Sequence, residues 1–142
     1  MSYQFTSNML PLVIATLISG TLSWYTWRYR RTPGVAPFSV MMLILFQWGT
    51  GYIFELAATE LSSKMFWIKF MFAGVTATPV AWLVFALEYT GRKAWTTRLR
   101  LLLLSILPLT TMGIILTNDA HHLFWTDASL AREGGFLLLN TV

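Results

Sequence analysis

The sequence predicts an all-α integral membrane protein, a four-transmembrane-helix bundle with a short external β-hairpin at its C-terminus. Two observations lead to this fold class. Hydrophobic residues make up 56% and charged residues 11% of the 142-residue chain, whereas an ordinary soluble domain is about a quarter charged. Four apolar stretches approach the roughly 20 helical residues that cross about 30 Å of hydrocarbon. We therefore expect one membrane domain over residues 1–142.

The four predicted spans cover residues 9–27, 37–58, 62–89 and 99–117. Pro37 suits a first helical turn, where its missing N–H costs nothing, and Ser62 can cap the third helix. Gly91 follows the third stretch, where a C-cap glycine belongs. Pro79 and Pro108 lie inside the third and fourth stretches, and each removes one backbone hydrogen bond and is expected to bend its helix. The third stretch is longer than a bilayer requires, so we expect it to tilt or to extend beyond the bilayer.

The basic residues predict the orientation of the chain. Seven of the ten Lys and Arg residues fall in the short loops after the first and third spans: Arg28, Arg30, Arg31, Arg92, Lys93, Arg98 and Arg100. The positive-inside rule places these loops in the cytoplasm, which puts both the N-terminus and the C-terminus outside. No Lys or Arg precedes the first apolar stretch, so we expect a retained helix rather than a cleaved signal peptide.

The external β-hairpin is predicted over residues 123–140. Glu133, Gly134 and Gly135 supply turn chemistry between "FWTDASL" and "FLLLN". "FLLLN" is too short to form a fifth span by itself. It either forms the second strand of the hairpin or begins a further span.

Composition excludes several classes of protein. The chain has no cysteine, so it has no disulfide framework, thiolate metal site or thiol nucleophile. The basic residues are not mixed with aromatic residues along one face, so we expect no nucleic-acid partner. No Ser/His/Asp set shares a plausible site and no metal-ligand spacing is present. We therefore predict no catalytic residue, no metal site and no cofactor, and the sequence leaves pigment binding open.

Three stretches resemble a known family: "FELAATELSSKMFWIKF", "PVAWLVFALEYTGRKAW" and "LPLTTMGIILTNDAHHLFW". Their order and spacing, over about residues 31–125, are similar to the N-terminal seven-transmembrane region of bacterial and archaeal sensor histidine kinases. The resemblance implies a multi-pass receptor in the bacterial cytoplasmic (inner) membrane that passes a signal to a cytoplasmic kinase. The 142 residues match only the first four helices of that pattern and include neither a phosphoacceptor histidine nor an ATP-binding domain.

Two functions from different classes remain open at this point. The first is a non-catalytic sensory or signal-reception module, which the resemblance implies. The second is a small accessory or structural subunit of a multi-subunit membrane complex, with or without a pigment or redox group. In both cases the expected partners are the lipid bilayer and helices of other membrane proteins.

A polar cluster near the outer ends of the second and third spans is the candidate ligand-binding or structural site. Gln47 and Glu55 share one face of the second helix at i+4 steps through Gly51. Lys69 is predicted at a depth similar to that of Glu55, because a short loop makes the two helices antiparallel neighbours. A charge at mid-membrane costs at least about 2.5–3.5 kcal/mol, so we expect Glu55 and Lys69 to form an interhelical ion pair. The cluster either clamps the two helices or lines a pocket open to the outside.

His121, His122 and Trp125 are predicted to be interfacial residues just outside the fourth span. Adjacent residues on a helix point in different directions, so the two histidines are a poor two-ligand metal site. One imidazole has the chemistry of an axial ligand for haem or chlorophyll. The other interpretation is a hydrogen-bonding residue packed under the hairpin.

Overall fold

The structure, a computed structural model, describes residue 5 and residues 9–125, 128–133 and 136–141. Its elements are α1 (Leu10–Trp27), α2 (Val35–Ala57), α3 (Leu61–Tyr89), a 3-10 turn η2 (Lys93–Trp95), α4 (Arg98–Leu116), α5 (Asn118–His121), β1 (Ala128–Glu133) and β2 (Phe136–Thr141). The four long helices start and end within two residues of the ranges predicted from the sequence.

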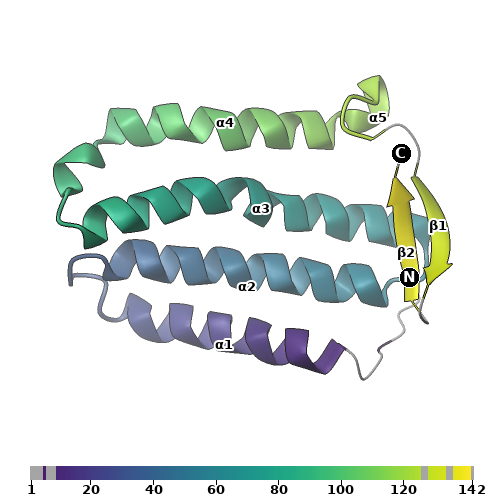
Figure 1. The fold of residues 1–142 in the computed structure, drawn as a ribbon, viewed down its shortest axis with the longest axis horizontal. Coiled ribbons are helices and arrows are strands. Elements are labelled where there is room, and N and C mark those ends of the chain that lie inside the picture. Colours follow the sequence, from purple (N-terminus) through teal and green to yellow (C-terminus); the bar gives the residue numbers. More distant parts are fainter. Residues whose placement is uncertain (1–4, 6–8, 126–127, 134–135, 142) are drawn as a thin grey trace.

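The four long helices lie side by side in chain order, as Figure 1 shows in a view down the shortest axis of the molecule. Each packs chiefly on its neighbours in the sequence, α1 on α2, α2 on α3 and α3 on α4. The four helices therefore form an open layer rather than the closed bundle that we expected, and α4 does not pack back onto α1. Lipid tails are as apolar as the side chains, so in a bilayer no hydrophobic force drives such closure.

The two ends of this layer have different connections. The end that we call the α5 end carries α5 and the α2–α3 connection at residues 58–60. The end that we call the basic end carries the connections at residues 28–34 and 90–97 and the start of α4 at Arg98 (Figure 1).

Within the described part of the chain, α2, α3 and α4 are long and apolar enough to cross a membrane. The chain is therefore a multi-pass membrane protein. The 18-residue α1 is not among these three helices, and Leu22 is the one aliphatic residue in its last two turns, which otherwise contain Ser, Thr, Trp and Tyr. A span by α1, which the four-span topology requires, remains a prediction.

The helix ends follow local chain chemistry. Gly91 has φ of 76°, and the N–H groups of Arg92 and Gly91 donate to the carbonyls of Leu87 and Glu88 at 2.8 and 3.2 Å. This is the Schellman arrangement, so the predicted C-cap glycine is confirmed. The predicted Ser62 cap is wrong, because α3 already begins at Leu61 after the extended residue Glu60, and no side chain caps it.

Glycines allow the helices to approach closely at two points of the layer. A Cβ added at Gly49 in α2 would fall on the Thr16 hydroxyl of α1, and one added at Gly74 in α3 would fall on the Gln47 amide oxygen of α2. Small residues serve this purpose in membrane helices, where packing rather than hydrophobic exclusion holds the helices together.

The C-terminal segment forms an antiparallel pair of strands, in register from Ala128 opposite Thr141 to Glu133 opposite Phe136. Residues 134–135, which include the predicted turn glycines, lie outside the described residues. The two strands lie at the α5 end of the layer (Figure 1), and β2 contacts α2.

Candidate functional site

A buried lysine joins the end of α2 to the start of α3. Lys64 has no exposed side-chain surface, and its ammonium lies 2.6 Å from the backbone oxygen of Glu55 and 3.2 Å from the Glu55 carboxylate. The backbone oxygen belongs to the last turn of α2, where carbonyls have no partner within the helix. One ammonium therefore caps the negative end of α2 and neutralises the carboxylate beside it.

The predicted ion pair between Glu55 and Lys69 is wrong. Lys64 takes the Glu55 carboxylate, and Lys69 instead donates to the Asp119 carboxylate at 2.9 Å. The reason is the helical period. Lys69 follows Lys64 by five residues and so lies about 140° further round the axis of α3. Two lysines at this spacing do not both face α2, and Lys69 faces α5 instead.

Gln47 does not join either charged pair. Its amide nitrogen donates to the backbone oxygen of Phe70 in α3, beside the glycine at position 74 that leaves room for it. Gln47 lies about 12 Å along α2 from Glu55 at the helical rise of about 1.5 Å per residue. The three residues of the predicted polar cluster therefore make three separate contacts and do not line one pocket.

Asn118, a residue that the sequence analysis did not single out, organises the segment after α4. We call residues 117–125 the cap segment. The Asn118 side chain is buried, and its amide nitrogen donates to the backbone oxygen of Trp125 at 2.9 Å. Its amide oxygen accepts from the N–H groups of Phe124 and Trp125 at 2.8 and 3.3 Å. One side chain thus satisfies three backbone groups and folds the cap segment back on itself.

Trp125 is buried in the protein, and its position at the membrane interface stays a prediction. Its ring forms a small core with Ile68 of α3 and Ile115 of α4, and it lies 6.2 Å from the ring of Phe72. The hydrogen bonds from Asn118 hold the backbone of this tryptophan in place. The cap segment is therefore bonded to α5 and packed against α3 and α4 at the same point.

His121 uses both ring nitrogens inside the cap segment. Nδ1 accepts from the N–H of Leu123 at 3.1 Å, so Nε2 carries the proton of the neutral ring and donates to the Thr117 hydroxyl at 2.9 Å. That hydroxyl in turn donates to the backbone oxygen of Gly113 at 2.7 Å. His122 ends α5 in the left-handed conformation, with φ of 50°. The geometry matches the interpretation of His121 as a hydrogen-bonding residue.

The Lys69–Asp119 pair is the exposed member of these contacts. The Asp119 side chain is 75% exposed, and the hydrogen bond and positive charge of Lys69 lower the pKa of this carboxyl below its ordinary value. The pair fastens α5 to α3 where water can reach both groups. It therefore holds the cap segment less firmly than the buried contacts of Asn118.

At the basic end, arginine side chains lie over tryptophan rings. The guanidinium carbons of Arg28 and Arg100 lie 4.1 and 4.6 Å from the ring centres of Trp24 and Trp95. Buried hydroxyls join α1 to α2 nearby, where Ser23 donates to the backbone oxygen of Ser39 at 2.9 Å. The sequence analysis noted the basic loops but not these contacts.

A cavity of about 480 Å³ lies between α2, α3 and α4 in the half of the layer nearer the basic end. Small residues and a proline line much of it, including Ala36, Ala77, Ala81, Ser105 and Pro108. α4 packs against α3 at the α5 end, where Ile115 is buried, and borders this cavity further along.

Residues 11–142 match the family described as the N-terminal 7TM region of histidine kinase. The match covers more of the chain than the stretches that carried the resemblance. No curated protein and no solved structure matched the chain in the same comparisons.

Proposed function

This chain belongs to the N-terminal seven-transmembrane region of histidine kinases, and from that premise we propose that it receives a signal in the membrane by shifting the packing of α4 against α3. This region is the sensory part of its kinase, so we propose that the chain acts without catalysing a reaction. The alternative role, as an accessory subunit of a membrane complex, gains no support from the family match.

The single observation that carries this mechanism is the uneven packing of α4. Ile115, near its α5 end, is the one residue of this helix that is buried, and it belongs to the core that Trp125 completes. The other half of α4 borders the 480 Å³ cavity, and Pro108, which lies inside this helix, is among the residues that line it. A helix fixed at one end and loosely packed at the other can pivot about the fixed end.

The cap segment is the proposed site of signal reception. Asn118 and Trp125 tie it to the fixed end of α4, and the Lys69–Asp119 pair ties it to α3. A signal that changes these contacts would therefore move α4 relative to α3. Such a signal must bind the two packings with different affinity, because equal affinity for both shifts nothing.

The charged and amide residues of α2 and α3 take structural roles in this proposal. Glu55 with Lys64, and Gln47 with the Phe70 carbonyl, hold α2 and α3 as one rigid pair. That pair is the reference against which α4 moves. We propose that α1 is a fourth span, that both termini are outside a bacterial inner membrane, and that helices of other membrane segments cover the exposed faces of α1 and α4.

Distance measurements between spin labels test the pivot in reconstituted vesicles. One pair of labels replaces Leu83 in α3 and Leu102 in α4, both exposed and both in the basic-end half. The control pair replaces Phe66 and Leu116, exposed positions of the same two helices at the α5 end. We expect a broad or two-peaked distance distribution for the first pair and a narrow one for the control. Equally narrow distributions would mean that α4 does not pivot.

A further inference from the structure

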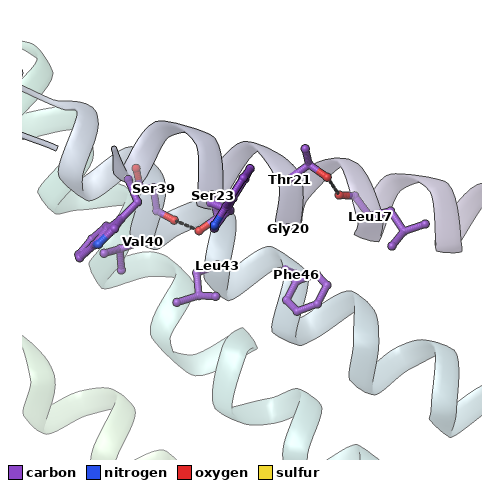
Figure 2. Close-up of a pocket in the computed structure, with 10 residues that line it drawn as sticks. Leu17, Gly20, Thr21, Ser23, Ser39, Val40, Leu43 and Phe46 are labelled. Atoms are coloured by element: carbon purple, nitrogen blue, oxygen red, sulfur yellow. Dashed lines mark hydrogen bonds between the residues drawn. The ribbon is translucent and has the colours of Figure 1, made fainter. Parts of the chain in front are cut away.

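An apolar groove of about 820 Å³ runs between α1 and α2, and Figure 2 shows side chains of both helices along it. Leu17, Trp24 and Trp27 of α1 and Val40, Leu43 and Phe46 of α2 form most of its walls. The volume falls within the roughly 300–1,000 Å³ typical of small-molecule sites. The groove is large enough to hold a chain-like apolar ligand.

The hydroxyl groups along the groove are already hydrogen-bonded within the protein. The Ser23 hydroxyl donates to the backbone oxygen of Ser39 at 2.9 Å, and the Thr21 hydroxyl donates to that of Leu17 at 2.7 Å (Figure 2). The Ser39 hydroxyl donates to the backbone oxygen of Val35 at 2.9 Å. A polar ligand would find no free partner among these groups, whereas a hydrocarbon chain needs none.

Two guanidinium groups stand at the basic end of this groove. Arg28 lies over Trp24 at 4.1 Å and Arg30 lies over Trp27 at 5.3 Å, measured from guanidinium carbon to ring centre. Both tryptophans line the groove, so the two cations lie against rings that form part of its walls. The pairs Glu55–Lys64 and Lys69–Asp119 lie at the α5 end, and no ion pair found among the described side chains involves Arg28 or Arg30. A guanidinium without a carboxylate partner keeps its forked donors available for a phosphate.

We propose that this groove binds an anionic phospholipid, with one acyl chain between α1 and α2 and the phosphate on Arg28 and Arg30. A single acyl chain or a basic patch alone gives weak attachment, and the two together give a stable one. The occupant comes from the leaflet at the basic end. The inference rests on the proposal above that α1 lies in the membrane.

Native mass spectrometry of the purified chain in detergent tests this site with an equimolar mixture of phosphatidylglycerol and phosphatidylcholine. We expect one retained phosphatidylglycerol, preferred over phosphatidylcholine by roughly tenfold or more. The variant Arg28→Gln/Arg30→Gln should lose the preference. The matched control Arg98→Gln/Arg100→Gln removes the same charge at the same end and should keep it. If both variants lost the preference equally, the preference would depend on the total positive charge at this end rather than on Arg28 and Arg30, and the proposal would be overturned.

A second variant tests the acyl chain separately from the phosphate. Leu43→Trp fills the groove at a side chain that is 54% exposed, so the helix pair should fold, which circular dichroism checks. Retention of phosphatidylglycerol should fall for this variant although both arginines remain. Unchanged retention would overturn the groove as the chain site. Displacement of the lipid by millimolar inorganic phosphate would overturn it too, because free phosphate has no chain to place there.

Cysteine labelling separates failure of this inference from failure of the topology. The chain has no native cysteine, so Ser7→Cys and Thr32→Cys can each be probed alone with an impermeant reagent in sealed vesicles. Opposite accessibility means that α1 crosses the membrane. If the unsubstituted protein showed no preference for phosphatidylglycerol although the two cysteines had opposite accessibility, the lipid site alone would be wrong. Equal accessibility of the two cysteines would count against the fourth span.

Discussion

The two ends of the helix layer handle charge in opposite ways. At the α5 end, Lys64 is buried against Glu55 and Lys69 binds Asp119, so each lysine has a partner within the fold. At the basic end, Arg28 and Arg100 lie over tryptophan rings and remain in contact with their surroundings. The comparison teaches that charge at the α5 end fixes the helices to one another. We propose that charge at the basic end meets a partner outside the chain.

The same division leads us to expect that the α5 end is the firmer of the two. A buried ion pair tolerates little displacement, because separating its members leaves an uncompensated charge in a medium of low dielectric. An arginine on a ring can slide without such a penalty, and the energy at stake is about 0.5–1 kcal/mol at exposed sites. We therefore expect movement of α2 against α3 at the α5 end to cost more than displacement of an arginine at the basic end.

The largest effect is expected from breaking the buried pair with Lys64→Met. This change leaves the Glu55 carboxylate without its counter-charge and the last turn of α2 without its cap. We expect a loss of about 3 kcal/mol in the free energy of unfolding, measured by tryptophan fluorescence in a denaturing-detergent titration. The double variant Lys64→Met/Glu55→Gln should recover much of it, because no charge is then buried alone.

Lys69→Met is the matched control for that experiment, since it removes a lysine from the same helix whose partner is exposed. It should change stability little, as surface ion pairs contribute little. If Lys69→Met cost as much as Lys64→Met, the contrast between a buried and an exposed pair at this end would be lost.

A smaller effect is expected from Asn118→Ala. The variant leaves the N–H groups of Phe124 and Trp125 and the Trp125 carbonyl without their partner. We expect a cost of about 2 kcal/mol, with faster amide exchange at both N–H groups and a shift in tryptophan emission. Asn118→Asp keeps the acceptor oxygen but replaces the donor with a second oxygen that faces the Trp125 carbonyl, so the exchange rates at the Phe124 and Trp125 N–H groups should be intermediate. Unchanged exchange in the alanine variant would show that the cap segment is held by packing alone.

The smallest effect concerns the pH dependence of the Lys69–Asp119 pair. Because Lys69 lowers the pKa of Asp119, the pair's contribution to stability is present above the unfolded pKa of about 3.9. It is lost as pH falls through the lower, folded pKa. We expect the carboxyl of Asp119 to titrate below about 3.9 by NMR, and to return close to that value in Lys69→Met. A midpoint that does not change on removal of Lys69 would show that the pair does not form in solution.

Hydropathy and helix punctuation predicted the number and limits of the long helices. Each of these features depends on a residue and its near neighbours, such as Gly91, which ends α3 in a conformation that other residues rarely adopt. The free energy of transferring an apolar stretch into lipid is likewise a sum of contributions from consecutive residues. Local signals of this kind do not depend on how distant parts of the chain pack. The family resemblance rested on such signals too.

Only the tertiary structure determined which charged residues form ion pairs with one another. The sequence placed Glu55 and Lys69 at similar depth, but contact depends on the rotation of α3 about its axis, and each residue along a helix changes that rotation by about 100°. Lys64 reaches α2 because three residues of connection bring the two helix ends together. The role of Asn118 depends in the same way on where the chain returns after α5. These partners are set by the positions of segments relative to one another, which residue types and spacing along the chain do not encode by themselves.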